Sequence, residues 1–209
     1  MTVLEQSAFG PQPQFGLQDR IVDATLRCIA RWGIAKTTLD DVAREAGCSR
    51  ATVYRACPGG KDGLIEAVVQ HELARFFGAL GSRLDAVADQ GLEELLVVGM
   101  SEAGRRILEH PALQYVLLNE PEAICPHLAF SQMDVVLRTA SEFAAPWLAR
   151  HLPDEEAARL AEWVARILLS YASMPADGVD ITDETSIRRL VRTFVLPGIQ
   201  SNSQGETSS

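Results

Sequence analysis

The segment from Ser49 to Arg55 concentrates cationic and hydrogen-bonding side chains around one small residue. Arg50 and Arg55 are able to bind phosphate or to read the edges of guanine bases. Thr52 offers a hydroxyl group and a methyl group that suits thymine, and the small Ala51 allows close approach to a groove. This combination predicts a helix that enters the major groove of double-stranded DNA.

The residues before this segment predict a short amphipathic helix followed by a tight turn. Thr38 to Asp41 has the pattern of a helix N-terminus, with a hydroxyl cap followed by acidic residues. Apolar residues at the spacing i, i+3, i+4 and i+7 would bury one face of this helix against Val53. These residues are Leu39, Val42, Ala43 and Ala46. Gly47 permits the turn and Ser49 is a favourable N-cap, so the pattern is that of a helix-turn-helix.

Two flanking helices complete the predicted DNA-binding domain. The first is expected from Leu17 to Trp32 and ends at Gly33, and the last begins after the break at residues 58–60. Threonine hydroxyls and a lysine ammonium group beside the recognition helix are expected to hold the DNA backbone. The expected DNA contacts are Thr37, Thr38, Ser49, Arg50, Ala51, Thr52, Tyr54, Arg55 and Lys61.

The stretch from Asp19 to Leu64 closely resembles the N-terminal domain of TetR-family transcriptional regulators. The motifs that carry the resemblance are I-x-D-A at residues 21–24, G-x-x-x-T-T at 33–38, D-x-A-x-x-A-G at 41–47, S-x-x-T-x-Y at 49–54 and the following G-K-D. The resemblance implies a dimeric DNA-binding protein whose C-terminal helices bind a small ligand and pair with a second subunit. It also implies that Thr38, Ser49, Arg50, Thr52, Tyr54 and Lys61 lie at DNA, with Tyr54 reaching a phosphate.

One departure from the family pattern lies directly after the recognition helix. At Ala56 and Cys57 the chain carries smaller side chains than the family usually has, notably Cys57 in place of a phenylalanine. This departure predicts local repacking beneath the recognition helix without a change of fold.

Composition and charge distribution bound the fold class. The 209 residues are 47% apolar, which is enough to bury a sizeable core, and strand signals are nearly absent, so the fold is predicted to be all-α. Residues 17–63 hold eight Lys and Arg against six Asp and Glu, a charge of +2, whereas the rest of the chain carries −11. This asymmetry allows one segment to face a polyanion while an acidic body supplies solubility.

The expected organisation has two domains and two tails. Residues 17–63 form the helix-turn-helix domain and residues 64–198 a larger helical domain, while residues 1–16 and 199–209 are flexible tails. No apolar run is long enough to cross a membrane, the first residues lack a signal-peptide pattern, and the four cysteines form no C-x-x-C pair. These features predict a cytoplasmic protein without a membrane partner.

The larger domain carries many Met, Leu and aromatic residues. Such residues usually form a core, but the resemblance implies that the core of this domain encloses a ligand cavity. An apolar lining favours an apolar, fatty-acid-like ligand, and Arg138 is the candidate partner for a carboxylate. The expected ligand-binding residues are Met100, Tyr115, Phe130, Met133, Leu137, Arg138 and Trp147.

The last two predicted helices carry apolar stripes, and the first of them is apolar on more than one face. Such a helix contacts both its own core and a second surface, which predicts a four-helix bundle formed by two subunits. The expected interface residues are Leu160, Val164, Ile167, Leu168, Tyr171, Ile187, Leu190, Val191 and Phe194.

Other functions have weaker support. His71, His110, His127 and His151, even with Glu120 and Glu122, lack metal-ligand spacing, and the sequence holds no phosphate loop or nucleophile motif, so neither a cofactor nor catalysis is expected. A helical protein-interaction dimer without DNA function is the other alternative. Cys28, Cys48 and Cys57 are interpreted as core and turn residues, with a thiol switch as the alternative. The sequence therefore predicts a repressor that a small ligand releases from a pseudo-palindromic operator.

Overall fold

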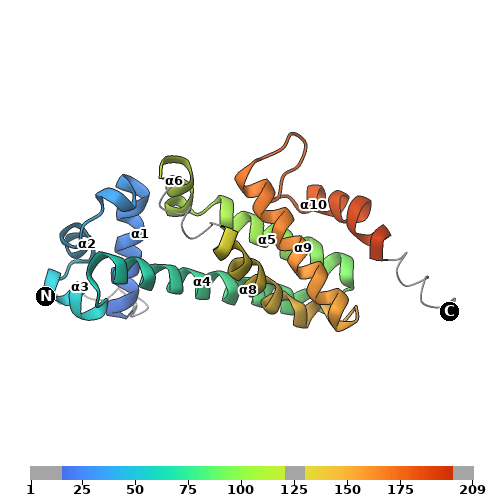
Figure 1. The fold of residues 1–209 in the computed structure, drawn as a ribbon, viewed down its shortest axis with the longest axis horizontal. Helices are drawn as coiled ribbons and strands as arrows, with labels where there is room; N and C mark the ends of the chain where they lie inside the picture. The colour runs from blue at the N-terminus through green and yellow to red at the C-terminus, as the bar shows by residue number, and fades with distance from the viewer. Residues whose placement is uncertain (1–15, 121–129, 200–209) are drawn as a thin grey trace, which may run out of the picture. The chain divides into compact units, whose positions relative to one another are not determined.

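The computed structural model describes residues 16–120 and 130–199, with residues 130–136 described as backbone only. Every regular element in these ranges is helical (Figure 1), which confirms the predicted all-α fold. The chain divides into two compact units, residues 1–71 and 72–209, called here the N-terminal and the C-terminal unit. Helix α4, Gly60–Val87, begins in one unit and ends in the other, and it includes the position at which the sequence predicts a domain boundary.

The N-terminal unit is built from three helices and the first turns of α4. Helix α2 packs against both α1 and α3, and the shared core includes the fully buried Ile21, Val42 and Val53 together with Leu64 of α4. Burial of each such side chain contributes about 1.5–3 kcal/mol, so this small core holds the three short helices in one arrangement. The helices are α1 (Leu17–Lys36), α2 (Leu39–Ala46) and α3 (Arg50–Ala56).

Helix α1 is interrupted near its end. Gly33 has φ of 84° and ψ of 171°, so the first helical run ends where the sequence predicts, and a short helical turn then continues to Lys36. Thr37 follows this turn and is buried, with its hydroxyl group donating a hydrogen bond to the carbonyl oxygen of Gly33 at 2.6 Å. The side chain of Thr37 therefore closes the turn from inside.

Helix α5 is the central element of the C-terminal unit and, within the described residues, contacts each helix that follows it. Its residues from Leu95 to Val98 are all buried, because neighbouring helices cover it on several sides. Arg188 of α10 joins it from the far end of the chain, with ion pairs to Glu93 at 3.1 Å and to Glu94 at 2.8 Å. The elements are α5 (Leu92–Leu108), α6 (Pro111–Asn119), α8 (Phe130–Leu148), α9 (Asp154–Ser173), α10 (Glu184–Leu190) and a π-helical turn η1 (Val191–Val195).

Close backbone approach fixes one side of α5. A Cβ atom at Gly104 would collide with the backbone carbonyl of Ile181, so only glycine fits at this position without a shift of the backbone. Ile181 itself is 3% exposed and belongs to the core of the unit. Among the described residues, no helix combines the length and the apolar character needed to span a membrane.

Candidate nucleic-acid interface

The N-terminus of α2 is closed by reciprocal hydrogen bonds. The Thr38 hydroxyl oxygen accepts from the backbone N–H of Asp41 at 3.2 Å, and the Asp41 carboxylate accepts from the backbone N–H of Thr38 at 3.3 Å. The Thr38 hydroxyl group also donates to this carboxylate, and this hydrogen bond is the main reason that the pKa of Asp41 lies below its ordinary value. The predicted capping signal is confirmed, and it fixes the start of α2.

The turn between α2 and α3 has the geometry that the sequence predicts. Gly47 adopts the left-handed conformation with φ of 64°, which is accessible to glycine at little cost. Ser49 caps α3 by accepting from the backbone N–H of Thr52 at 3.1 Å, and the two hydroxyl groups are 2.8 Å apart. A hydrogen bond of 2.7 Å from Arg20 to the carbonyl of Ala46 ties this turn to α1. The start of α3 is therefore fixed by its own cap, and the turn before it is held by α1.

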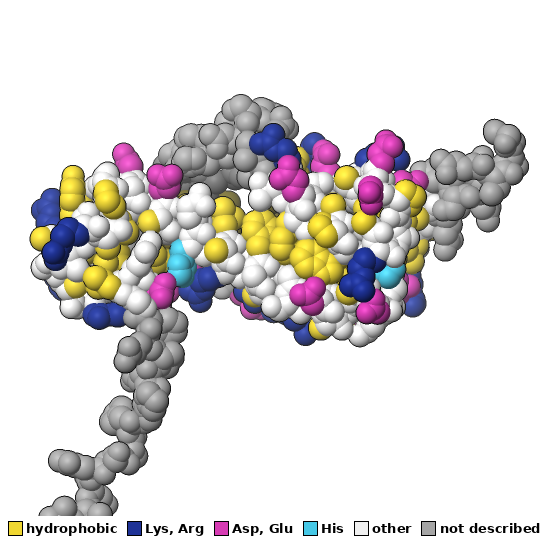
Figure 2. Space-filling model, turned by 90° about the horizontal axis from the view of Figure 1, so that it is seen from below, with side chains coloured by type: hydrophobic (Ala, Val, Ile, Leu, Met, Phe, Trp, Pro, Cys, Tyr) yellow, Lys and Arg dark blue, Asp and Glu magenta, His cyan; other side chains and the backbone are white. Residues whose placement is uncertain are grey.

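Helix α3 presents one buried and one exposed face. Val53 is completely buried, whereas Arg50, Ala51 and Arg55 are exposed and Tyr54 retains 54% of its accessible surface. Lys and Arg side chains lie beside hydrophobic side chains on the surface of this unit, at the left of Figure 2. The fold thus brings the expected cations and Tyr54 together on a solvent-facing surface that a groove of DNA could cover.

Several of the expected DNA contacts also bind partners within the protein, Ser49 and Thr52 at the cap of α3 among them. Thr37 is 2% exposed and hydrogen-bonded to Gly33, so the expectation that it contacts DNA is corrected: it is a structural residue of the turn. Thr38 is exposed but serves as the cap of α2. Lys61 donates a hydrogen bond of 2.8 Å to the carbonyl of Ala35, which leaves the other two ammonium hydrogens for further acceptors.

Two acidic residues of α2 form ion pairs with arginines of other helices, and the sequence did not predict these pairs. Glu45 joins α2 to α1 through ion pairs with Arg27 at 2.6 Å and Arg31 at 3.3 Å, and the hydrogen bond from Arg27 is the main cause of its lowered pKa. Asp40 forms an ion pair of 3.0 Å with Arg50 of the recognition helix. None of these three pairs follows a local sequence spacing, because the partners come from different helices.

The cysteines of this unit fill its interior. Cys28 is completely buried and Cys57 is 2% exposed, and burial raises the pKa of both thiols. A raised pKa keeps a thiol protonated and weakly nucleophilic, which favours the core interpretation for these two residues. Cys48 lies at the turn and is partly buried against the same core. Cys57 occupies a core position without filling the volume of an aromatic ring.

Two of the residues expected to bind a ligand share the core of the C-terminal unit, where Met100 is buried and Trp147 packs against the cluster. Met100 and Leu137 are almost fully buried, while Tyr115 and Trp147 are half-buried. Trp147 packs against Phe143 and donates a hydrogen bond of 2.8 Å to Asp85. Arg138 is exposed and lies 3.9 Å from Glu142 on its own helix. The side chains of Phe130 and Met133 lie outside the described residues, as do Cys125, Glu122 and His127.

The buried carboxylate of Glu102 on α5 lies close to arginines of α4 and α5. Glu102 has only 9% of its side chain exposed and pairs with Arg105 at 2.5 Å and Arg106 at 2.7 Å, and Arg83 of α4 lies 4.0 Å away. The carboxylate is therefore paired with arginines whose side chains remain partly exposed. Within the described part of the chain, no group of three His, Cys, Asp or Glu side chains has the geometry of a metal site.

The residues expected at a subunit interface separate into two groups. Leu168, Ile187, Leu190 and Val191 are buried within the single chain, so they support its core and do not offer surface to a partner. Phe194 is 72% exposed, and the remaining four are half-buried: Leu160, Val164, Ile167 and Tyr171. Trp163, which the expected set omits, is 37% exposed.

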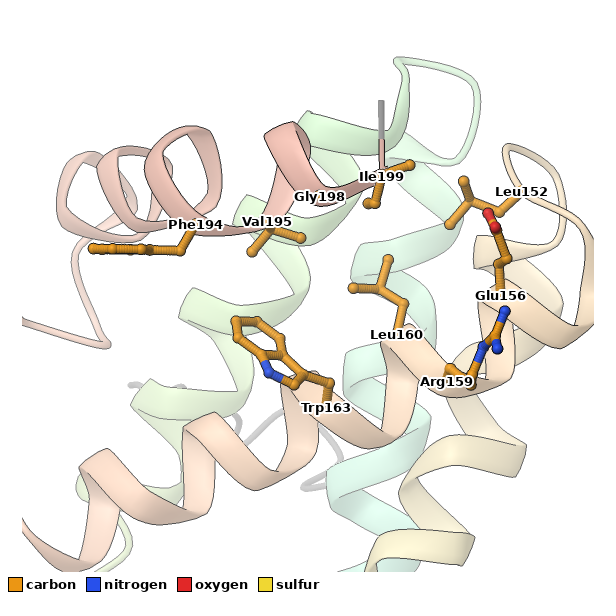
Figure 3. A pocket seen from close by; sticks show the side chains of 9 residues that line it. All are labelled: Leu152, Glu156, Arg159, Leu160, Trp163, Phe194, Val195, Gly198 and Ile199. Carbon is orange, nitrogen blue, oxygen red and sulfur yellow. The ribbon is translucent and has the colours of Figure 1, made fainter. Parts of the chain in front are cut away.

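A pocket of about 340 Å³ lies between α9 and residues 194–199, which include the end of η1. Leu160 and Trp163 point from α9 toward Val195 across this pocket, and Phe194 projects beside it (Figure 3). Glu156 and Arg159 lie at one end of it (Figure 3). The pocket is therefore a mainly apolar hollow with a charged end.

Comparison with known proteins matches the N-terminal unit to a family. The family described as "Bacterial regulatory proteins, tetR family" matches this chain over residues 21–68. An uncharacterized HTH-type transcriptional regulator of Mycobacterium tuberculosis (strain CDC 1551 / Oshkosh) is 29% identical over 181 residues, which cover 86% of this chain and 83% of that protein. The HTH-type transcriptional regulator BetI of Burkholderia mallei is 37% identical over 81 residues, which cover 37% of this chain and 41% of that protein.

Solved structures extend the likeness of the fold to both units. The TetR family repressor AlkX from Dietzia sp. strain DQ12-45-1b, implicated in biodegradation of n-alkanes, gives a TM-score of 0.62 at 22% identity and covers 90% of this chain and 98% of its own. The fatty acid degradation regulator FadR from Bacillus halodurans gives 0.60 at 17% identity, over 88% and 99% of the two chains. The matched residues 21–68 are those that build the capped turn and the exposed face of α3, and together with the relatives and the structural neighbours they support a TetR-family DNA-binding transcriptional regulator.

Proposed function

We propose that the protein is a repressor that binds a pseudo-palindromic operator as a homodimer and leaves it when a small apolar ligand binds. The observation that carries the DNA-binding part is the exposed surface of α3, with Arg50, Ala51, Tyr54 and Arg55 beside the rigid turn. In a helix-turn-helix, the N-terminal residues of the second helix contact base edges in the major groove. Arg50 and Ala51 are the first two residues of α3 and therefore lie at that end.

The proposed contacts divide into base readout and backbone binding. Arg50 and Thr52 lie near the start of α3 and are assigned to base edges, with Ala51 allowing close approach. Tyr54 and Arg55 are assigned to phosphates, together with the free ammonium hydrogens of Lys61. Ser49 and Thr38 act first as helix caps, and both residues are exposed.

The proposed homodimer uses α9 and the segment around η1. The support is the pair of exposed aromatic residues Trp163 and Phe194 at the edge of a mainly apolar pocket, since aromatic side chains are enriched at the centres of protein interfaces. Val164, Ile167 and Tyr171 continue the half-buried surface of α9. A two-fold pair of subunits would present two recognition helices to half-sites about one helical turn apart.

The proposed effector is apolar and fatty-acid-like, and it would bind in the C-terminal unit among α5, α6 and α8. The support is the apolar character of Met100, Tyr115, Leu137 and Trp147, since each methylene that leaves water contributes about 0.8 kcal/mol. The names of the two structural neighbours mention n-alkanes and fatty acids, but at 22% and 17% identity their likeness extends to the fold alone. The ligand acts only if it favours one conformation of the protein over another.

A titration of fluorescent DNA tests the DNA-binding function. The full-length protein is added to the duplex upstream of its own gene and to a shuffled duplex, at several salt concentrations. Specific binding that weakens steeply with salt is expected, because phosphate contacts release counterions. Equal affinity for the two duplexes, or no binding, would contradict the proposal. Addition of fatty acids of increasing chain length then tests the effector, which should lower operator affinity without altering binding to the shuffled duplex.

A further inference from the structure

An ion pair joins the two helices of the helix-turn-helix at its outer surface. Nη1 of Arg50 donates a hydrogen bond of 3.0 Å to Oδ2 of Asp40, which lies in the first turn of α2. Both side chains are well exposed, at 64% for Arg50 and 56% for Asp40. The pair therefore lies at the surface that carries the proposed DNA contacts and outside the core of the unit.

The stability of the fold does not require this carboxylate. The capping box of α2 is formed by Thr38 and Asp41, so Asp40 is not needed to close the helix. An exposed ion pair contributes little to folding, since solvent screens it and two long side chains lose freedom. A carboxylate beside a recognition helix also opposes the approach of phosphate groups. These costs are consistent with a role that appears when DNA is bound.

The geometry of the guanidinium group indicates what that role is. Arg50 offers two pairs of parallel N–H groups, and the hydrogen bond to Asp40 engages Nη1 alone. The edge formed by Nε and Nη2 stays available, and an edge of this kind fits the O6 and N7 atoms of guanine. If Arg50 moved instead to a phosphate, it would leave Asp40 without its partner beside a polyanion. Asp40 thus favours a base contact over a phosphate contact.

We propose that Asp40 is a specificity-determining residue that directs Arg50 to a base edge, an inference that rests on the DNA-binding function proposed above. Asp40 is a positioning residue in this scheme, because it acts through Arg50 and need not touch the DNA. Its removal gives a protein that binds DNA more tightly in general and discriminates less between sequences.

Selection from a random duplex pool tests this inference, because it identifies the preferred bases without requiring a known operator. Full-length wild-type protein and Asp40→Asn are each taken through the same rounds of selection, and the enriched sequences are compared position by position. The wild-type protein is expected to enrich guanine at one position of each half-site. Asp40→Asn should lose that preference and keep the others. Circular dichroism establishes that the exposed substitution leaves the helical content unchanged.

Titrations with the selected duplex and a shuffled duplex then give the size of the effect. For Asp40→Asn, the ratio of the two affinities should fall by about tenfold, the size of one bidentate base contact, while affinity for the shuffled duplex rises. Glu66→Gln is the matched control, since Glu66 is an exposed carboxylate on α4 of the same unit. It should leave the ratio unchanged. In an Arg50→Ala background, Asp40→Asn should no longer alter the ratio.

The outcomes separate the two levels of the proposal. If the wild-type protein enriches no sequence from the pool, the DNA-binding function fails and the role of Asp40 falls with it. If the wild-type protein enriches a sequence and Asp40→Asn keeps every base preference, only the role of Asp40 is overturned. A change of the affinity ratio that persists in the Arg50→Ala background would also overturn it, since Asp40 would then act independently of Arg50.

Discussion

The N-terminal and the C-terminal unit place their charged and polar side chains differently. In the N-terminal unit, the helix caps of the recognition motif bind partners three residues away, as Thr38 does with Asp41 and Ser49 with Thr52, and longer-range pairs such as Arg50 with Asp40 join its helices. In the C-terminal unit, Arg188 binds Glu93 and Glu94, which lie 95 and 94 residues earlier in the sequence. Local bonds fix a short motif independently of the rest of the chain. Distant bonds form only when the larger unit has folded.

The largest expected effect comes from a charge placed inside the C-terminal unit. Val191→Asp buries an unpaired carboxylate at a completely buried position, which should destabilise the unit by at least about 3 kcal/mol. Phe194→Asp, three residues later and 72% exposed, should leave the fold intact and weaken the proposed dimer. Thermal unfolding followed by circular dichroism and light scattering distinguish the two. A folded Val191→Asp dimer would refute the assignment of Val191 to the core.

A methyl group placed on α5 tests the close approach inside the same unit. Gly104→Ala should destabilise the protein by about 1–3 kcal/mol, because the new Cβ collides with the backbone of Ile181. Gly78→Ala is the matched control. Gly78 lies within α4, and no neighbouring atom lies within 4 Å of the Cβ that alanine would add. This substitution should stabilise the helix by about 0.5–1 kcal/mol. Denaturant titration measures both. Equal effects would show that the backbone around Ile181 yields easily.

Removal of one arginine from each unit tests whether DNA binding belongs to the N-terminal unit. Arg50→Ala should cost about 1–3 kcal/mol of specific binding if its contact is to a base edge. Arg83→Ala removes the same charge from the C-terminal part of α4, where Arg83 lies near Glu102 and Glu184, and should leave specific binding almost unchanged. Anisotropy titration with the selected duplex supplies both values. Comparable losses in the two variants would point to a general charge effect.

The smallest expected effect is the response to acid. The pKa values of Asp41 and Glu93 are both lowered, first by hydrogen bonds from Thr38 and Arg188. A lowered folded-state pKa contributes stability that is present above the unfolded pKa and is lost as pH falls through the folded value. Melting temperatures should therefore decline below about pH 5, and Asp41→Asn and Glu93→Gln should each flatten this decline slightly. An unaltered pH profile in both variants would contradict the linkage.

Local signals in the sequence were sufficient to predict the helix-turn-helix. The cap at Thr38, the left-handed Gly47 and the cap at Ser49 are each formed within a few residues, so their types and spacing determine them. The burial of Thr37 was not predictable in this way, because its partner is a carbonyl group exposed by the break at Gly33. The ion pair of Asp40 and Arg50 depends on how two helices cross, which no spacing rule contains.

The apolar stripes of the last helices show the corresponding limit in the C-terminal unit. The pattern predicted buried faces, and Ile187, Leu190 and Val191 are buried. It could not distinguish burial in the chain's own core from burial against a partner, since both require the same residue types. The π-helical turn added a further difference, because it shifts the register after Leu190 and leaves Phe194 exposed.

The π-helical turn also has a consequence for how such proteins diverge. A π turn is equivalent to an α-helix that has accepted one extra residue, and such turns are often found at functional sites. Deletion of one residue from Val191–Val195 would restore the α-helical repeat and rotate the following residues by about 100° relative to the preceding ones. A different side chain would then replace Phe194 at the surface. Two copies of the gene that differ by this single codon would then present different side chains at the surface that the proposed dimer uses.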